Sequence, residues 1–267
     1  MNIGLIAGSG RLPLLFAQAA ARAGRRVVAA AHEGETDPSL AAHVARLGWV
    51  KLGQLGGIVE LLRGEGCAEA VFCGGITKVR LFDVRPDLLG LRTLASMRSF
   101  GDDAALRAIA AALEREGVRV VSPLPLVPEL LAPAGPIGRR RLSDEQRADA
   151  AVGLEVARAL GTLDVGQTVV VKRGVVLAVE AAEGTDACIA RAGALARGGG
   201  PGPVAVKVQK PDQDERFDVP SVGPGTIEAL RAAGCSALVV EAGRTLLIDR
   251  ADLAAAADAA GIAVEGA

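Results

Sequence analysis

The chain has 267 residues, enough for two domains, and its 30 Lys and Arg nearly balance its 31 Asp and Glu. This balance excludes the broad basic surface with which proteins grip nucleic acids, so no nucleic-acid partner is expected. No run approaches the ~20 apolar residues of a membrane span, and the apolar start lacks the basic segment of a signal peptide.

Cysteine and histidine are scarce. The 4 cysteines show no CxxC spacing, which disfavours a zinc site or a disulfide framework and fits a cytoplasmic protein. The chain has 2 histidines and no tyrosine. Acid–base or metal chemistry must therefore use carboxylates, lysine, serine or threonine, and carboxylates prefer hard cations such as Mg²⁺.

Residues 1–121 alternate short apolar runs with amphipathic stretches. The runs expected to form buried strands are 2–7, 25–31, 68–75 and 117–121. The stretches with helical periodicity are 12–24, 56–66 and 102–117. Strands alternating with helices predict an α/β fold, with an N-terminal Rossmann-like domain built on a parallel sheet.

The segment 122–142 is rich in proline and is predicted to be a linker without regular structure. A C-terminal domain, 143–267, begins where Ser143 and Gln146 form a plausible capping box. The pattern predicts a hairpin turning at 172–174, which makes this second domain a mixed α/β unit. Its other expected strands are 203–208, 235–241 and 245–249, and its expected helices lie near 185–197, 226–233 and 251–260.

A glycine loop lies between the first strand and the first helix. Gly8, Ser9 and Gly10 could let backbone N–H groups approach a phosphate at the helix N-terminus, or could form an ordinary tight turn. Pro13 stands where the dinucleotide fingerprint requires a third glycine, which disfavours NAD, although Glu33 could still hold a ribose. Contact with a phosphate or nucleotide is the preferred interpretation.

Three further segments have both a structural and a functional interpretation. Gly74 and Gly75 follow a strand, at the edge where α/β sheets collect ligands, or simply form a turn. Asp103 lies at a helix start, where aspartate is a common cap and could also meet a metal or substrate. Thr185 and Asp186 precede a helix and could cap it or bind an anion.

The stretch 210–220, KPDQDERFDVP, concentrates charge between two prolines. Because proline disfavours a helix, an extended path is expected, which puts Asp212, Asp214, Arg216 and Asp218 on one face. Carboxylates alternating with a guanidinium suit a Mg²⁺–phosphate site. A solvated, salt-bridged loop is the alternative.

Several of these segments together resemble the LpxI-type UDP-2,3-diacylglucosamine pyrophosphatases of lipid A biosynthesis, nearly end to end. The matching segments are GLIAGSGRLP (4–13), GDDAALR (101–107), LDVGQTVVV (163–171), VLAVEAAEGTDA (176–187), KPDQDERFDVPSVG (210–223) and EAGRTLLIDR (241–250). The glycine loop is weakly specific to this family, whereas VLAVEAAEGTDA (176–187) and KPDQDERFDVPSVG (210–223) are strongly specific to it. The chain departs from the pattern at Gly75, where relatives often carry asparagine.

The resemblance implies Mg²⁺-dependent hydrolysis of UDP-2,3-diacylglucosamine to UMP and 2,3-diacylglucosamine 1-phosphate (lipid X), with Mn²⁺ as a possible substitute. It also implies two domains with the lipid product between them and a homodimer. The protein is expected in the cytoplasm, with peripheral contact to inner-membrane lipid.

The essential aspartate of the family falls on Asp218, which becomes the candidate metal ligand or base, with Asp214 as a second ligand. The candidates for stabilising phosphoryl charge are Arg216, Lys210 and Gln213. Substrate contacts are assigned to Gly8, Ser9, Gly10, Asp103, Thr185 and Asp186. Two alternatives stay open: an NAD(P)-dependent oxidoreductase built on the first domain, and a non-catalytic lipid- or nucleotide-binding protein.

Overall fold

The computed structural model describes residues 2–76, 84–97, 102–196, 199–211 and 213–267. The chain divides into two compact units. Unit 1 comprises Met1–Pro128 together with Glu215–Phe217, and unit 2 comprises Glu129–Asp214 and Asp218–Ala267. The chain therefore returns to unit 1 for three residues inside the charged stretch of the second half.

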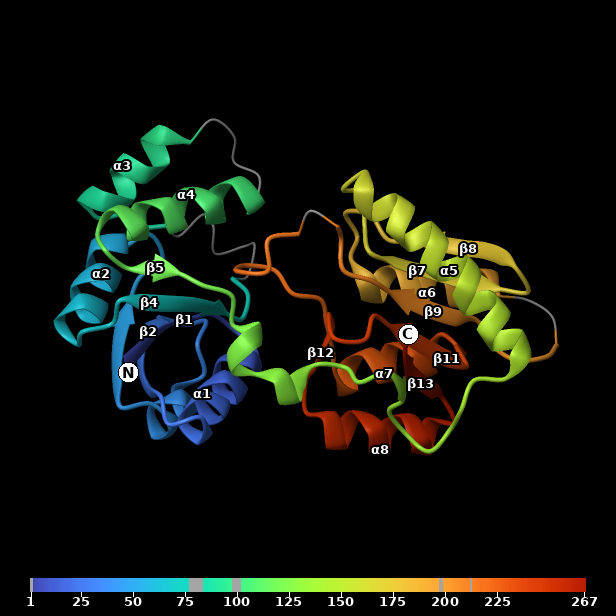
Figure 1. The fold of residues 1–267 in the computed structure, drawn as a ribbon. Helices are drawn as coiled ribbons and strands as arrows, with labels where there is room; N and C mark the ends of the chain where they lie inside the picture. The colour runs from blue at the N-terminus through green and yellow to red at the C-terminus, as the bar shows by residue number, and fades with distance from the viewer. Residues whose placement is uncertain (1, 77–83, 98–101, 197–198, 212) are drawn as a thin grey trace. The chain divides into compact units, whose positions relative to one another are not determined.

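Unit 1 is built on a parallel sheet of the order β3-β2-β1-β4-β5, so the prediction of a Rossmann-like parallel domain is confirmed (Figure 1). Its strands are β1 (Asn2–Ala7), β2 (Arg26–His32), β3 (Arg46–Val50), β4 (Glu69–Cys73) and β5 (Arg119–Val120). Its helices are α1 (Leu12–Arg22), α2 (Leu55–Gly64), α3 (Leu88–Ser96), α4 (Asp102–Arg115) and the 3₁₀ turns η1 (Pro38–His43) and η3 (Leu124–Leu126).

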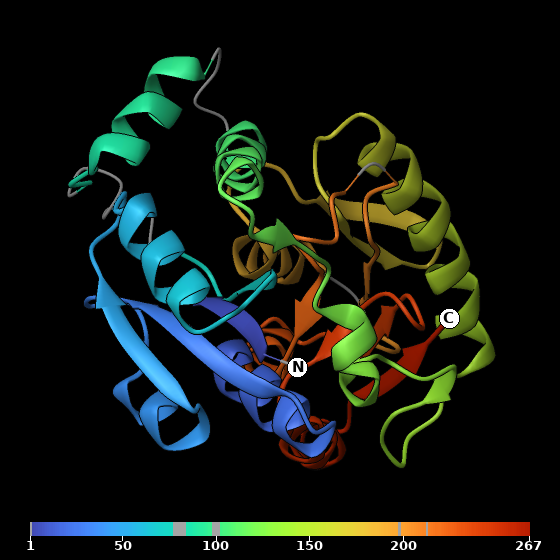
Figure 2. The same ribbon diagram turned by 60° about the vertical axis from the view of Figure 1, so that its left-hand side comes forward.

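Helices cover both faces of the unit 1 sheet. The apolar sides of α2 and α4 pack with β-strand residues such as Val28 and Ala70 in one buried cluster, and α1 lies on the other side (Figure 2). The central strands are buried on both faces, which is why they read as continuous apolar runs. The sequence pattern does not predict β3 or α3, because β3 is half exposed and α3 leaves several leucines in solvent.

Unit 2 contains a mixed sheet of the order β6-β13-β11-β9-β7-β8, as predicted. The strands of this sheet are β6 (Gly135–Pro136), β7 (Thr168–Lys172), β8 (Val175–Val179), β9 (Val204–Lys207), β11 (Ala237–Val240) and β13 (Ala263–Gly266), while β10 (Ser221–Val222) and β12 (Leu246–Leu247) form a second small sheet. The helical elements are the 3₁₀ turn η4 (Pro128–Leu130), whose first residue belongs to unit 1, α5 (Asp144–Thr162), α6 (Thr185–Leu195), α7 (Pro224–Ala232) and α8 (Arg250–Ala260).

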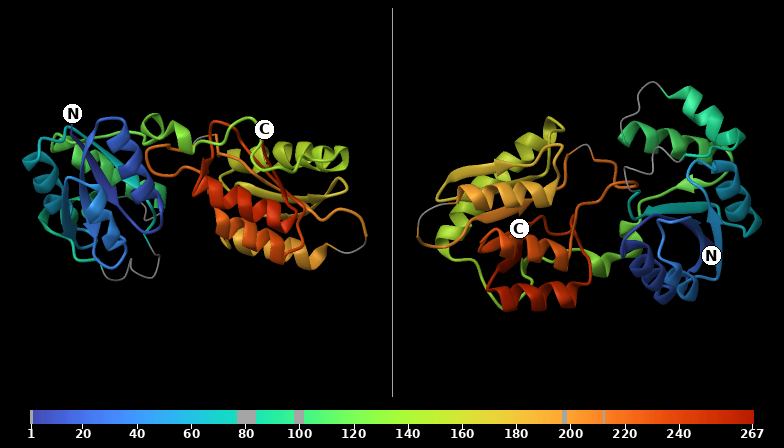
Figure 3. Two further views of the ribbon diagram at one scale, coloured as in Figure 1. Left: turned by 90° about the horizontal axis from the view of Figure 1, so that it is seen from below. Right: turned by 180° about the vertical axis from the view of Figure 1, so that it is seen from behind.

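In unit 2, α5 packs on one face of the sheet and α6, α7 and α8 on the other (Figure 3). Alternate strand residues point to the two faces, so that Val169 and Val171 meet α5 while Val170 meets the opposite helices. Apolar contacts with these helices therefore stabilise the sheet on both faces. Polar groups lie at the ends of its strands.

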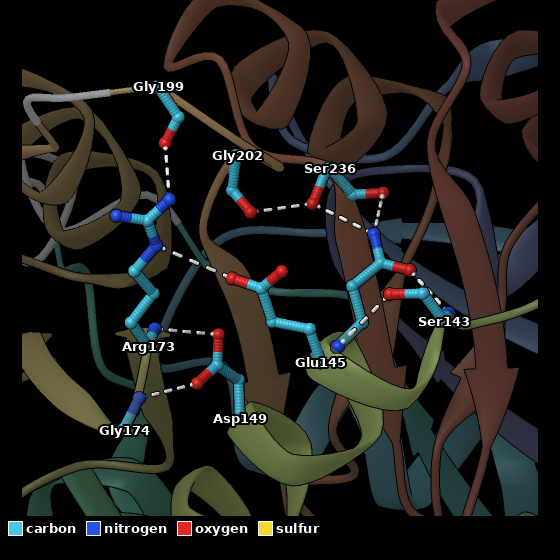
Figure 4. A network of polar contacts seen from close by, with 9 residues as sticks. Ser143, Glu145, Asp149, Arg173, Gly174, Gly199, Gly202 and Ser236 are labelled. Carbon is cyan, nitrogen blue, oxygen red and sulfur yellow. Dashed lines mark hydrogen bonds and ion pairs between the residues drawn. The ribbon is translucent and has the colours of Figure 1, made fainter.

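The start of α5 organises one corner of unit 2 (Figure 4). Ser143 Oγ accepts from the Gln146 amide at 3.2 Å and Gln146 Oε1 accepts from the Ser143 amide at 2.8 Å, which confirms the capping box. One turn later the buried carboxylate of Asp149 accepts from the amides of Arg173 (2.9 Å) and Gly174 (2.6 Å). Both turn residues have positive φ, at 51° and 72°, as a two-residue hairpin turn requires.

The expectation that 122–142 contains no regular element is wrong. Proline suits the first positions of a 3₁₀ turn and an edge strand, because neither position needs its missing N–H. Pro123 precedes η3, Pro128 opens η4, and Pro136 lies in β6, which pairs antiparallel with β13. Part of this proline-rich segment is thus built into the sheet of unit 2.

Candidate functional site

The charged stretch 210–220 does not follow one extended path, so the prediction that its alternate residues share a face is wrong. The Gln213 amide donates to the Lys210 carbonyl oxygen at 3.1 Å, and the Asp218 amide donates to the Asp214 carbonyl oxygen at 3.2 Å. Each bond closes a local turn. The second turn brings the backbones of Asp214 and Asp218 together, with residues 215–217 between them. Asp212 lies outside the described residues.

Residues 215–217 form the tip of that second turn and pack within unit 1. The Phe217 ring meets the Phe72 ring edge-on, with centroids 5.6 Å apart and planes at 70°. Arg216 lies over the Phe217 ring at 4.8 Å and its Nη1 lies 3.3 Å from Glu114 Oε1. The guanidinium is therefore anchored on an aromatic ring and a carboxylate of unit 1, in an arrangement that combines cation–π and ionic contacts.

The polar side chains of the stretch that surround Asp218 belong, like Asp218 itself, to unit 2. Gln213 Nε2 donates to Asp218 Oδ2, while Gln213 Oε1 accepts from the Lys210 amide at 3.1 Å. Lys210 Nζ pairs with Asp164 Oδ1 at 2.7 Å. Gln213 thus fixes the orientation of an exposed carboxylate, and the assignment of Asp218, Gln213 and Lys210 to one site stays a prediction.

A second group of polar side chains gathers where β7, β8 and β9 meet the start of α6. Lys207 is the register partner of Thr168 across β9 and β7, and the Glu180 amide donates to the Thr168 carbonyl oxygen at 2.8 Å. Thr185, the first residue of α6, donates its hydroxyl proton to Glu180 Oε1 at 2.9 Å. Lys207 Nζ donates to Thr185 Oγ1 at 3.2 Å and to the Ser221 carbonyl oxygen at 3.3 Å.

This lysine cluster (Lys207, Thr185, Glu180 and Thr168) lies in the electrostatic range of the predicted site residues. Burial lowers the pKa of the Lys207 ammonium below its ordinary value, and the nearby carboxylates of Glu180, Asp218 and Asp186 oppose that shift. Lys207 therefore hydrogen-bonds to Thr185 and lies within range of the charges of Asp186 and of Asp218, which is distant from both in sequence. The sequence pattern does not single out Lys207 or Glu180, although the hairpin register could have placed Glu180 beside Thr168.

In unit 1 the glycine loop of residues 8–10 is hydrogen-bonded to the segment that contains the second glycine pair, Gly74 and Gly75. The Gly8 amide donates to the Cys73 carbonyl oxygen at 2.8 Å, and the Ser9 amide and hydroxyl both donate to the Gly75 carbonyl oxygen, at 2.7 and 2.9 Å. A Cβ on Gly8 would collide with the Gly75 carbonyl, and one on Gly74, whose φ is +85°, with the Ser9 carbonyl. The amides of Gly8 and Ser9 are thus used internally, and the role of this loop in substrate contact stays a prediction.

A buried histidine lies beside this loop. His32 ends β2 with 7% of its surface exposed, and its Nδ1 lies 2.9 Å from the Ala7 carbonyl oxygen. Thr36 Oγ1 donates to the same oxygen at 2.6 Å. Burial lowers the pKa of His32, against the opposing effects of the Ala7 contact and the Glu35 charge. These contacts give His32 a structural role at the end of the parallel strands.

Within the described parts of the chain, neither the cysteines nor a cluster of metal-binding side chains marks a functional site. The four cysteines are buried free thiols, and burial raises the pKa of Cys188 to about 11 and of Cys235 to about 12. Among the described residues, no group of three or more His, Cys, Asp or Glu could hold a metal ion. The side chain of Asp103, in the first turn of α4, lies outside the described residues.

Comparison with known proteins decides the family. The model of the LpxI N-terminal domain matches residues 2–130, and that of the LpxI C-terminal domain matches residues 133–265. The chain belongs to the LpxI family. It is 38% identical to the UDP-2,3-diacylglucosamine pyrophosphatase LpxI of Caulobacter vibrioides, over 99% of this chain and 97% of the relative.

The LpxI family models divide the chain close to the division between units 1 and 2, which falls after Pro128. All members of the lysine cluster, and Asp218 with Gln213, lie in the part matched by the LpxI C-terminal model. The two glycine loops and His32 lie in the part matched by the N-terminal model. The resemblance inferred from the sequence motifs is therefore confirmed for both halves.

Proposed function

We propose that the protein hydrolyses the pyrophosphate bond of UDP-2,3-diacylglucosamine, releasing UMP and 2,3-diacylglucosamine 1-phosphate for lipid A biosynthesis. The protein is thus a hydrolase acting on a phosphoanhydride. The observation that carries the proposal is the identity to a pyrophosphatase of that name over nearly the whole length of both chains. The polar groups gathered around Asp218 and Lys207 supply chemistry suited to a phosphoanhydride.

Asp218 is the residue proposed to accept the proton of the attacking water. It is exposed, and the hydrogen bond from Gln213 holds one of its carboxylate oxygens. A general base must lie within hydrogen-bond reach of the proton that it takes, so its orientation matters as much as its pKa. Asp186 and Thr185, at the start of α6, would line the site next to it. Lys210 and Arg216 would contribute positive charge by exchanging Asp164 and Glu114 for phosphoryl oxygens.

Asp214 and Asp218 are the proposed Mg²⁺ ligands. Their backbones are joined by one hydrogen bond, so both carboxylates leave the same turn, and carboxylate oxygens are the ligands that hard cations prefer. Mg²⁺ often binds through one or two carboxylates together with substrate phosphates, which suits a site without a third acidic ligand among the described residues. Bound Mg²⁺ supplies Lewis acidity toward phosphoryl oxygens.

The experiment that tests this function is release of UMP from UDP-2,3-diacylglucosamine by the purified full-length chain. Mg²⁺ or Mn²⁺ should support turnover, and EDTA should abolish it without changing the thermal unfolding midpoint. Restoring Mg²⁺ after EDTA should restore the rate. Absence of turnover with either metal, or turnover that survives exhaustive chelation, would contradict the substrate or the metal part of the proposal respectively.

Two further properties belong to this proposal. We expect a homodimer, which light scattering on the full-length chain would measure. We also expect peripheral contact with lipid, because the proposed substrate carries two acyl chains. None of the described helices combines the length and the apolar character needed to cross a bilayer.

A further inference from the structure

We propose that Lys207 binds the phosphoryl group of the substrate, and that Thr185 and Glu180 act as positioning residues that hold its ammonium in place. The inference rests on the proposed pyrophosphate hydrolysis and adds to it a residue and a subsite. The subsite consists of the Lys207 ammonium at the end of β9, the Thr185 hydroxyl and the first turn of α6.

The hydrogen bonds already made by Thr185 and Lys207 determine which of the two side chains can bind an anion. A threonine hydroxyl has one proton to donate, and the proton of Thr185 goes to Glu180 Oε1 at 2.9 Å. The oxygen of Thr185 then accepts from Lys207 Nζ at 3.2 Å. Thr185 in this arrangement cannot donate to a phosphoryl oxygen, so of these two side chains Lys207 is the donor.

Lys207 has a donor to spare. An ammonium carries three N–H protons, and Lys207 uses two of them, on Thr185 Oγ1 and on the Ser221 carbonyl oxygen at 3.3 Å. No partner for the third occurs in the described parts of the chain. Both acceptors are neutral, and both distances are long for a charged donor, so a phosphoryl oxygen would make a stronger bond.

The other cations of the site differ in this respect. Lys210 is paired with the Asp164 carboxylate at 2.7 Å and Arg216 with the Glu114 carboxylate at 3.3 Å. The charge of each is thus already balanced by a neighbouring carboxylate. Lys207 is the half-buried cation whose hydrogen bonds go to neutral oxygens, so its charge is available to an incoming anion at the lowest cost.

Glu180 explains why the ammonium stays in this position. Its carboxylate is 8% exposed, with one oxygen on Thr185 and the other without a hydrogen-bond partner among the described residues. A buried carboxylate favours a nearby cation, and the low local dielectric strengthens that attraction. Glu180 therefore attracts the Lys207 ammonium through the intervening Thr185 hydroxyl, while Asp186 and Asp218 are exposed to solvent.

The first test compares Lys207→Met and Lys207→Arg with the wild type in UDP-2,3-diacylglucosamine hydrolysis, with exposed Lys51→Met in unit 1 as the matched control. Loss of a donor to a developing anion should lower kcat/KM of Lys207→Met about 10²–10³-fold, mainly through kcat. Lys207→Arg should recover at least part of this loss, and Lys51→Met should match the wild type. Turnover by Lys207→Met within about threefold of the wild type would overturn the proposal.

The second test does not depend on turnover or on the stability of a variant. Wild-type protein carrying ¹³Cε-lysine is titrated with pyrophosphate, and the Lys207 resonance is assigned from its absence in Lys207→Arg. We expect the Lys207 resonance to shift in a saturable manner while that of Lys51 does not. An unchanged Lys207 resonance at millimolar pyrophosphate would overturn the subsite. Wild-type protein that binds pyrophosphate through Lys207 but does not turn over the sugar nucleotide would contradict only the proposed function.

Discussion

The two glycine loops of unit 1 and the lysine cluster of unit 2 both lie at strand ends, yet they use their polar groups in opposite ways. In unit 1 the amides of Gly8 and Ser9 donate to carbonyl oxygens of the neighbouring loop. In unit 2 the Lys207 ammonium rests on neutral oxygens, and a buried oxygen of Glu180 has no hydrogen-bond partner among the described residues. The amides of Gly8 and Ser9 are thus hydrogen-bonded within the protein, whereas the lysine cluster keeps a donor and an acceptor without partners among the described residues.

This difference shows why a glycine-rich turn is weak evidence for a phosphate site. Glycine at positions 8 and 74 is required because two backbone segments pass closer than a Cβ permits. The same residues would be required if a phosphate occupied that space. Unused donors and buried charge are the better indicators of chemistry, because an unsatisfied buried polar group costs stability unless a ligand compensates it.

The largest expected effect is on turnover, and it belongs to unit 2. Asp218→Asn should lower kcat by about 10²–10⁴-fold, because the amide cannot take a proton from water. The side chain is exposed, so the thermal unfolding midpoint should stay near that of the wild type. Exposed Asp252→Asn on α8 is the matched control and should leave turnover unchanged. Near-normal turnover of Asp218→Asn would remove Asp218 from the site.

The next effect concerns unit 1 and should appear in stability. Gly74→Ala should lower the free energy of unfolding by about 2–4 kcal/mol, because it adds a strained φ to a collision with the Ser9 carbonyl. Gly64→Ala, at the end of α2 with open space around it, is the control and should be neutral or slightly stabilising. Chemical denaturation of the full-length chain measures both. Equal stability of the two variants would contradict the tight packing of the two loops.

Asp149, a polar residue of unit 2 outside the proposed site, provides a further test of the comparison between the two units. Asp149→Ala should destabilise the protein by about 2–3 kcal/mol, because two amides of the hairpin turn lose a charged acceptor. Exposed Glu155→Ala on the same helix should change stability little. The folded fraction of Asp149→Ala should keep its specific activity. A large loss of activity per folded molecule would connect the hairpin turn to catalysis.

The smallest effect expected is a pH dependence of unit 1. His32 has a pKa lowered by burial, so its neutral form is favoured in the folded state and its contribution to stability is present above the ordinary value of 6.5. That contribution should be lost as the pH falls through 6.5 toward the folded pKa. Thermal unfolding between about pH 7 and about pH 5 should show less pH dependence in His32→Gln than in the wild type. Exposed His43→Gln, as the control, should retain the dependence.

Local sequence determined most of the secondary structure. The alternation of apolar runs and amphipathic stretches predicts β1, β2 and β4 and the helices α1, α2 and α4, because periodicity reflects which face is buried. The capping box of Ser143 and the turn before Gly174 are also readable from neighbouring residues, since their hydrogen bonds span only a few positions. Family membership follows from motifs that survive as short contiguous strings.

Only the tertiary structure decided which of the charged residues act together. Arg216 pairs with Glu114, 102 positions away, and Lys207 meets Thr185 22 positions away. Alternation along 210–220 could not reveal this, because two backbone turns replace the regular strand on which alternation depends. Long-range pairing depends on sheet register and on the path of the chain between elements. For that reason the sequence could single out the charged stretch 210–220, but the hydrogen bonds around Lys207 required the fold.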